Sequence, residues 1–505
     1  MKIYLSILLS FICLSCSTCQ NIPDYNRFSG AINQDSISSW ITTLASPEFG
    51  GRHSGTAYEK ISSAWIKQKM GLAGIGGGFP ASTDPYAQKF SFLRNQPQQV
   101  FLLAGRDSLK QGRDFYISPL RHKRDSFQII FGGTGSEKDL QSLDVQGKVV
   151  AIADWFTEDP AREQEEMQNL GEVISRLEKL NAAGICITYR DEVFRYIPKM
   201  ELYNDILNTY LLPEANPAQV DSFLYILTRE RLVNKFFGKP IQVPNRIILR
   251  SGSLLVPGKD ERTWHLEARL KCDTVRAENI IGYIEGSRLK EEVIVISAHY
   301  DHLGKKGNEY FPGADDNASG VAALLSIARA FRMAVDMGYT PLRSVLFVAF
   351  SAEEQGEIGS AWYARHPIGR TVLNLNMDMI GRSDLNHTPA EPYVYYLTGK
   401  NQFSSFAPLM LDLAGTYAPS LQMDKRLNED DFLDYYHRSD HLSFAVDSIP
   451  FVVFTTGEHA DYHKTSDTYD KVEVRKVTQV ARVVGAFAWK FAYGSTDPAK
   501  PLPAD

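Results

Sequence analysis

The sequence lacks the features of a nucleic-acid-binding protein and of a protein with repeated membrane spans. Its 54 Lys and Arg residues are outnumbered by 60 Asp and Glu residues, and the formal net charge is −6. Without a basic excess there is little to neutralise a phosphate backbone, so nucleic acid is disfavoured as the main partner. After the first twenty residues no apolar run approaches the length of a membrane helix. No internal repeat is present, and low complexity is confined to the tail at 497–505.

Cysteine is scarce in the body of the chain. Three of the five cysteines, Cys13, Cys16 and Cys19, lie at the amino terminus, and only Cys186 and Cys272 remain beyond them. Two cysteines do not make a disulfide framework. They could still pair with each other in an oxidising compartment, and the sequence leaves this open.

The amino terminus has the pattern of an export signal. In residues 1–19, Lys2 precedes an apolar stretch, Ile3–Leu14, that is too short to span a bilayer. Ser15 before Cys16 resembles a bacterial lipoprotein site, which implies cleavage before Cys16; ordinary cleavage without a lipid is the alternative. We therefore expect the mature protein in the periplasm or cell envelope, lipid-anchored to a bacterial membrane through this end alone, with the leaflet left open.

The length of 505 residues allows two to four domains, at roughly 100–200 residues each. Residues 22–96 read as a helical lead-in, and 97–260 shift to short β-like runs joined by Gly-rich turns, which indicates an inserted domain. In 261–495, apolar strand runs alternate with helical stretches. The sequence therefore predicts an α/β protein: a mixed, mostly parallel sheet covered by helices on both faces, with an inserted β-rich α+β domain.

Four strand-like runs in the last domain end in, or lead into, potential metal ligands. The carboxyl ends of parallel strands share one edge of an open sheet, so such side chains are expected to lie together. Asp301, two residues after His299, could fix the tautomer of that imidazole. The candidates are His299 after VIVISA, Asp315 and Asp316 in GADDNASG before a helix, Glu353 and Glu354 after SVLFVAF, Asp378 in TVLNLNMDMIG, and His463 after IPFVVFTT.

A mixed set of imidazoles and carboxylates suits zinc. The candidates outnumber what one ion needs, which fits two ions roughly 3.5–4 Å apart that share a carboxylate and a water, and hydrolysis is the natural chemistry. Taken singly, such a histidine is more often a packing residue and such an acidic pair a solvated turn, but those interpretations would have to coincide at five positions. His302, His441 and His459 are interpreted as packing or loop residues.

Five segments, SAHYDHLG, GADDNASG, SAEEQGEIGS, NMDMIGR and DYHKTSDT in that order, resemble the motifs of metallopeptidase family twenty-eight. This is a family of co-catalytic dizinc aminopeptidases and glutamate carboxypeptidases with a phosphorylase/hydrolase-like core. The resemblance covers 266–490, and PEFGGRHSGTAYEKISSAWI is similar to the family's helical lead-in. The insertion resembles a protease-associated domain in GKVVAIAD and LEKLNAAGICITY, whereas the stretch from 200 to 245 departs from it.

The resemblance implies a role for each matched residue. His299 and Asp378 would bind one zinc, Glu354 and His463 the other, and Asp316 would bridge them. Asp316 is chosen over Asp315 because the family's bridging aspartate stands three residues before a Ser-Gly pair, here Ser319–Gly320. Glu353 would be the general base and Asp301 would orient His299. Tyr462 would donate a hydrogen bond to the developing oxyanion, and a packing role for it stays open.

We thus expect an exported zinc aminopeptidase that acts on peptides. A dizinc carboxypeptidase, dipeptidase or deacylase of the same fold is an alternative, since Glu353 or Asp378 could capture an α-amine while Arg382 or Arg438 could capture an α-carboxylate. A non-catalytic binding protein that keeps the fold is a further alternative. Residue specificity, the role of the insertion and the oligomeric state are left open by the sequence.

Overall fold

The computed structural model describes residues 22–104, 107–118, 124–141, 143–152, 163–189, 209–212, 223–229, 232, 261–384, 386–399, 403–429, 431 and 435–500. The predicted export signal, with its cleavage before Cys16, lies outside these residues. So does most of the stretch from 200 to 245.

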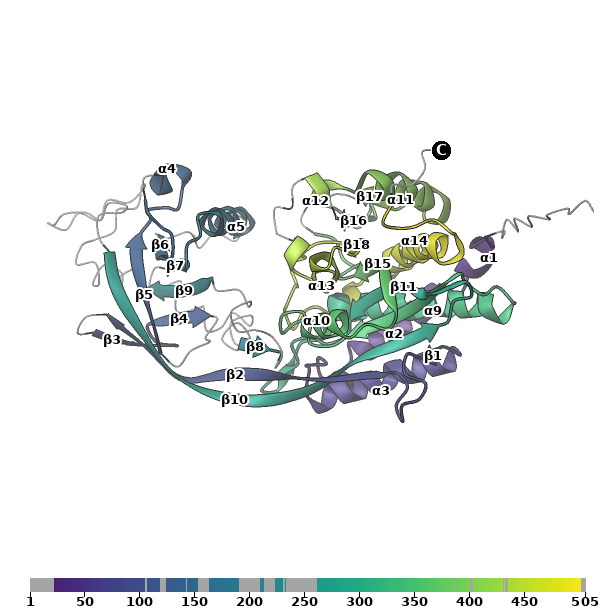
Figure 1. Cartoon of the computed structure of the whole chain (residues 1–505), viewed down its shortest axis with the longest axis horizontal. Coiled ribbons are helices and arrows are strands. Elements are labelled where there is room, and N and C mark those ends of the chain that lie inside the picture. Colours follow the sequence, from purple (N-terminus) through teal and green to yellow (C-terminus); the bar gives the residue numbers. More distant parts are fainter. Residues whose placement is uncertain are drawn as a thin grey trace, which may run out of the picture.

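The carboxy-terminal part of the chain, from β10 onward, is built on a mixed, mostly parallel sheet (Figure 1), in the order β17-β16-β18-β15-β11-β14-β10. β11 runs parallel to both β14 and β15, β15 to β18, and β16 to β17. Only β10 against β14 and β16 against β18 are antiparallel. The strands are β10 (Glu261–Ile284), β11 (Leu289–His299), β14 (Arg343–Phe350), β15 (Arg370–Met377), β16 (Tyr393–Thr398), β17 (Gln422–Asp424) and β18 (Phe451–Thr455).

Helices cover both faces of this sheet because its central strands are apolar on both sides. In β11, Ile294 and Ile296 belong to one hydrophobic cluster, whereas Val293 and Val295 belong to another. This alternation is the two-residue period of a strand buried on both faces. The first face is covered by α1 (Asn26–Ser29), α2 (Gln34–Leu44), α3 (Ala57–Leu72), α9 (Gly320–Asp336), α11 (Phe403–Tyr417) and α14 (Val474–Tyr493), and the second by α10 (Ile358–Arg365) and α13 (Leu442–Val446). The predicted α/β class is confirmed.

One helical segment is as apolar as a membrane span. Ala314–Asp336, which includes α9, is long and apolar enough to cross a membrane, but 78% of its most apolar stretch is buried inside the protein. Such burial is typical of a core helix.

A second lobe is joined to the first by a long two-stranded ribbon, seen along the lower edge of Figure 1. β2 (Ala87–Ala104) pairs antiparallel with β10 from Ala87 opposite Ile280 to Leu103 opposite His265. The far end of β10 then pairs with β5 of the second lobe. The other elements there are β3 (Asp107–Lys110), β4 (Phe115–Ser118), β5 (Arg124–Phe131), α4 (Glu137–Leu140), β6 (Val149–Ile152), α5 (Glu163–Lys179), β7 (Gly184–Tyr189) and β9 (Leu224–Arg229).

The second lobe has hydrophobic clusters of its own, one of which contains Cys186. The residue-97 boundary expected for the insertion falls within β2, in the middle of the ribbon. The domain limits and the protease-associated character of the insertion stay predictions. Cys186 is buried, Cys272 is exposed, and both thiols are free.

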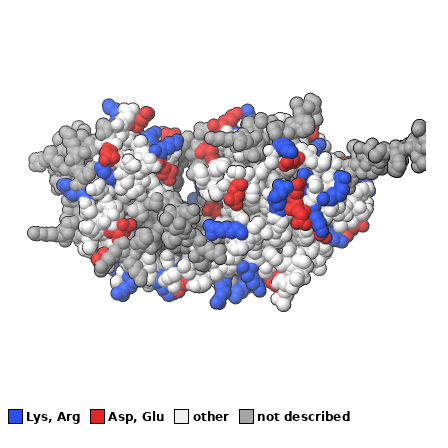
Figure 2. Space-filling model, in the orientation of Figure 1, with Lys and Arg blue, Asp and Glu red and all other residues white. Residues whose placement is uncertain are grey.

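The visible surface carries charges of both signs. Figure 2 shows Lys and Arg side chains interspersed with Asp and Glu over both lobes. This distribution agrees with the mild net charge of −6 and differs from the clustered basic face of a nucleic-acid-binding protein.

Candidate metal centre

The candidate ligands gather at one edge of the sheet because several of them follow the carboxyl ends of neighbouring strands. His299 is the last residue of β11, Asp378 follows β15 directly, and Glu354 lies four residues after β14. Asp316 comes from the turn Ala314–Ser319 that leads into α9, and His463 comes from the loop after β18. This is the edge at which open α/β sheets hold their ligands.

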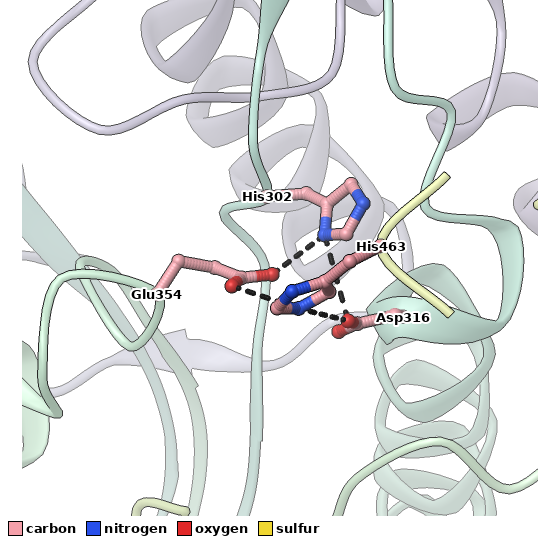
Figure 3. A group of neighbouring side chains, drawn as sticks. All are labelled: His302, Asp316, Glu354 and His463. Atoms are coloured by element: carbon pink, nitrogen blue, oxygen red, sulfur yellow. Dashed lines mark hydrogen bonds and ion pairs between the residues drawn. The ribbon is translucent and has the colours of Figure 1, made fainter. Parts of the chain in front are cut away.

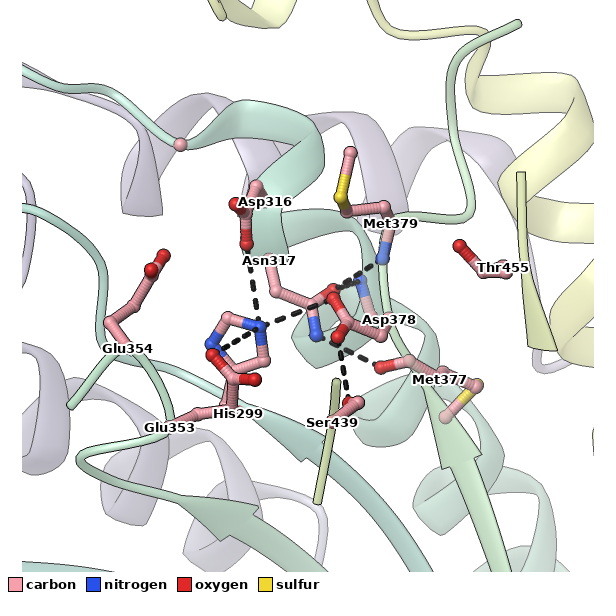
Figure 4. A network of polar contacts seen from close by, with 12 residues as sticks. His299, Asp316, Asn317, Glu353, Glu354, Met377, Asp378, Met379, Ser439 and Thr455 are labelled. Carbon is pink, nitrogen blue, oxygen red and sulfur yellow. Dashed lines mark hydrogen bonds and ion pairs between the residues drawn. The ribbon is translucent and has the colours of Figure 1, made fainter. Parts of the chain in front are cut away.

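The first half of the centre is formed around His299, whose side chain is 1% exposed. Its Nε2 atom lies 3.2 Å from Oδ1 of Asp378 and 3.4 Å from Oδ1 of Asp316 (Figure 4). An oxygen of Glu353 lies further away, at 3.8 Å. These three carboxylates therefore surround one ring nitrogen, with Glu353 outermost.

The second half is formed around His463 (Figure 3). Its Nε2 atom lies 3.1 Å from Oδ2 of Asp316 and 3.2 Å from Oε2 of Glu354. His302 is the fourth side chain: its Nδ1 atom lies 2.6 Å from Oε1 of Glu354 and 3.7 Å from Oδ2 of Asp316. The sequence predicted only a loop position near the site for His302. The only signal it offered was position, one residue after Asp301 and three after His299.

Asp316 belongs to both halves. Its Oδ1 atom faces His299 and its Oδ2 atom faces His463. The neighbouring Asp315 points elsewhere, because its Oδ1 atom accepts the N–H of Gly381 at 2.6 Å. Only Asp316 of the acidic pair thus offers one oxygen to each imidazole.

The donor set fits a pair of divalent ions. Two donors bound to one zinc at about 2.0–2.2 Å lie about 3.3–3.6 Å apart in tetrahedral geometry. The contacts of Asp316 with His299 and His463, and of His463 with Glu354, measure 3.4, 3.1 and 3.2 Å. Four largely buried carboxylates also need cations, since an unpaired buried charge is costly. They are Asp316, Glu353, Glu354 and Asp378.

The electrostatics of the metal-free centre reflect this concentration of acids. Burial raises the pKa of Glu353 well above its usual range, and the nearby carboxylate of Asp378 adds to this although His299 opposes it. Burial disfavours charge on His463, but the carboxylates of Glu354 and Asp316 raise its pKa to about 10. The surrounding carboxylates therefore favour positive charge at this place.

Two residues support the ligands from behind. Asp301 is fully buried, and its main-chain oxygen lies 3.2 Å from Nδ1 of His299, nearer than its carboxylate at 3.8 Å. The carboxylate instead accepts the N–H groups of Glu353 and Glu354 at 3.2 and 3.4 Å. Burial raises the pKa of Asp301 to about 7. Ser439, which the sequence did not single out, donates a hydrogen bond to Oδ2 of Asp378 at 2.7 Å.

Tyr462 stacks on His463, with ring centroids 3.9 Å apart. Its phenol oxygen accepts a hydrogen bond from Arg438 at 3.4 Å, which leaves the phenol proton free to be donated. A pocket opens beside Asp378 and Tyr462. Its other lining residues are Met379, Tyr435, Arg438, Ser439, Val453, Thr455 and Glu458.

The remaining histidines lie apart from the two clusters. His441 is fully buried and its ring packs on Phe451. His459 is buried near Asp315, with 3.5 Å between its Nε2 atom and Oδ2 of that residue. The sequence predicted a packing or supporting position for His441 and a loop position near the site for His459.

Comparison with known proteins places these residues in a family. Residues 279–488 match the model of Peptidase family M28. The chain is 26% identical over 242 residues to Aminopeptidase YwaD of Bacillus subtilis, a match that covers 45% of this chain and 48% of that protein. It is 30% identical over 212 residues to the uncharacterized protein YfbL of Escherichia coli, covering 37% and 64% of the two chains. The chain therefore spans less than two thirds of either relative.

The fold also has a counterpart among solved structures. An aminopeptidase from Aneurinibacillus sp. strain AM-1 superimposes with a TM-score of 0.53 at 19% identity, over 95% of this chain and 98% of that one. At this identity the likeness concerns the fold alone. The match to Peptidase family M28 covers residues 279–488, which include both clusters of donor side chains.

Proposed function

We propose that the chain is an exported zinc-dependent aminopeptidase that removes amino-terminal residues from peptides. The observation that carries the proposal is the position of Asp316, whose two oxygens face two separate imidazoles, His299 and His463. An arrangement of this kind suits a carboxylate that bridges two metal ions.

The residues fall into two ligand sets. His299 and Asp378 would hold one zinc, Glu354 and His463 the other, and Asp316 would be shared. When bound, the two ions would supply a water of lowered pKa and would polarise the scissile carbonyl. Metal ligands of these kinds bind as deprotonated carboxylates and neutral imidazoles, so zinc binding would release protons.

Glu353 is the general base in this proposal. Its carboxylate lies at the margin of the first ligand set, 3.8 Å from Nε2 of His299. This separation is longer than the distance of about 3.3–3.6 Å expected between two ligand atoms of one zinc ion. The raised pKa of Glu353 suits a group that takes a proton from water and passes it to the leaving amine. Tyr462 would donate its phenol proton to the oxyanion, and Asp301 would hold His299 in one orientation.

The state of two arginines favours an aminopeptidase over a carboxypeptidase. Capture of a peptide α-carboxylate would need a free guanidinium near the site. Arg438 is paired with Glu458 at 2.6 Å, and Arg382 is paired with Asp461 at 2.8 Å. Glu353 and Asp378, in contrast, are carboxylates at the centre that a substrate α-ammonium could approach.

Paired substrates test the proposal. We expect hydrolysis of a dipeptide with a free amino terminus and no hydrolysis of the same dipeptide with that terminus acetylated. Cleavage of the acetylated form alone would instead support the carboxypeptidase or deacylase alternative. Purified protein that binds no zinc would revive the non-catalytic alternative.

Export and lipid anchoring are proposed from the amino-terminal sequence alone. Mass spectrometry of the membrane-bound protein should find a mature amino terminus at Cys16 that carries a lipid. A Cys16→Ser variant should then keep its signal segment. Release of the non-mutated protein in soluble form, without a lipid, would contradict the proposed lipid anchor.

A further inference from the structure

Arg52 is a fully buried arginine whose hydrogen bonds all go to main-chain carbonyl groups. The side chain is 0% exposed. A guanidinium group has five N–H donors, and here each has an acceptor. Nε donates to Tyr300 at 2.8 Å, Nη1 to Leu44 and Pro312 at 2.8 and 2.6 Å, and Nη2 to Gly313 and Asp316 at 2.9 and 3.2 Å.

Four of the five carbonyls, those of Tyr300, Pro312, Gly313 and Asp316, belong to the two segments that carry His299 and Asp316. Tyr300 lies between His299 and Asp301, at the end of β11. Gly313 and Asp316 belong to the turn before α9, which supplies the carboxylate shared by both halves. The fifth carbonyl is that of Leu44, the last residue of α2. One side chain therefore joins the helical lead-in to the two segments that hold His299 and Asp316.

The charge of Arg52 also faces the acids of the site. Within the described residues it forms no ion pair at 4.0 Å or less, although Asp316, Asp301 and Glu354 all favour its charged form. A buried cation without a direct partner is costly unless its hydrogen bonds are satisfied. Its position behind the carboxylates opposes their mutual repulsion when no metal is bound.

We propose that Arg52 is a positioning residue that holds the His299 and Asp316 segments in their metal-binding arrangement before metal binds. This inference rests on the proposed zinc site. A lysine at position 52 would keep the charge, but its three N–H donors would leave at least two of the five carbonyls without a partner. The segments would then have to be ordered by the metal itself, which weakens binding.

Arg343 provides a matched control. Its side chain is 2% exposed, and it donates to the carbonyls of Phe491 and Gly494 and to the carboxylate of Glu292. It stands at the first residue of β14, at the strand end opposite the metal centre. Arg343→Lys therefore breaks a comparable buried network that does not touch the ligand segments.

The experiment compares three proteins: the full chain without substitution, Arg52→Lys and Arg343→Lys. Zinc affinity is measured by competition with a chelator, and thermal unfolding of each metal-free protein is followed in parallel. We expect both variants to melt at lower temperature, and only Arg52→Lys to bind zinc about 10- to 100-fold more weakly, the usual effect of removing support behind a ligand. Unchanged affinity in Arg52→Lys, or an equal loss in Arg343→Lys, would overturn the proposal. If the unmodified chain binds no zinc, the proposed function fails instead.

Folding of the variant is covered by a second measurement. If Arg52→Lys folds only when purified with zinc, the rate of zinc release to a chelator replaces the affinity, and release no faster than from Arg343→Lys overturns the proposal. If Arg52→Lys and Arg52→Gln both fail to fold with zinc while Arg343→Lys folds, Arg52 serves the stability of the whole lobe, which also contradicts a role confined to the metal centre.

Discussion

The Nδ1 atom of His302 lies 2.6 Å from Oε1 of Glu354, while the other oxygen of that carboxylate faces His463. A hydrogen bond at this distance fixes the rotation of the carboxylate. It directs Oε2 toward the position at which Asp316 and His463 also meet. His302 thus orients a ligand, as residues behind metal ligands commonly do.

Replacing His302 tests this orientation. We expect His302→Ala to weaken binding of the zinc held by Glu354 and His463 by about 10- to 100-fold, because the carboxylate is free to rotate. The ion held by His299 and Asp378 should keep its affinity. Calorimetric zinc titration of the metal-free protein resolves the binding of the two ions. Unchanged affinity for both ions in His302→Ala would show that His302 does not orient Glu354.

The general base is separable from the ligands. We expect Glu353→Gln to keep both zinc ions and to lower kcat by about a hundred- to ten-thousand-fold, because the amide cannot accept the proton from water. Metal content by mass spectrometry and steady-state kinetics on one preparation measure both quantities. A variant with unchanged kcat would reject the assignment.

The two adjacent aspartates provide a matched comparison. Asp316→Ala should lose both zinc ions together, because its two oxygens face both imidazoles. Asp315→Asn should retain both ions, because the Asp315 carboxylate accepts a hydrogen bond from the N–H of Gly381 and points away from the ligands. The number of zinc ions bound per chain after dialysis distinguishes the two variants. Equal metal loss in both would mean that Asp316 does not bridge the two ions.

The acid sensitivity of the fold depends in part on His441. Burial lowers its pKa from 6.5 to about 3. Above pH 6.5 the His441 ring is neutral in both the folded and the unfolded state. As the pH falls below 6.5, only the unfolded state binds a proton at this ring, so the folded state loses stability. The free energy of unfolding should fall by about 2 kcal/mol between pH 7.5 and 5 from this group.

Denaturant unfolding of metal-free protein at several pH values measures that dependence. His441→Phe, which lacks a titrating ring, should show a correspondingly shallower loss of stability. The same slope in His441→Phe and in the unmodified chain would contradict the assignment.

The sequence predicted the sheet and the grouping of the candidate ligands for one physical reason. Candidates such as His299 and Asp378 follow apolar runs, and the carboxyl ends of parallel strands necessarily meet at one edge. The choice between Asp315 and Asp316 came from the family pattern, and the two side chains do point in different directions.

What the sequence could not predict depends on contacts between distant segments. Arg52 and Tyr300 are 248 positions apart, and Ser439 is 61 positions from Asp378. Nothing in the local pattern of either residue indicates its partner. The length of the β2–β10 ribbon was also not foreseen, because the residues that pair across it lie on the two sides of the insertion.

The most direct test of the account is anomalous diffraction at the zinc edge from crystals of the zinc-loaded protein. A dizinc centre predicts two peaks roughly 3.5–4 Å apart, one beside His299 and Asp378 and one beside His463 and Glu354, with Asp316 between them. A single peak, or two peaks of which Asp316 contacts only one, would contradict it.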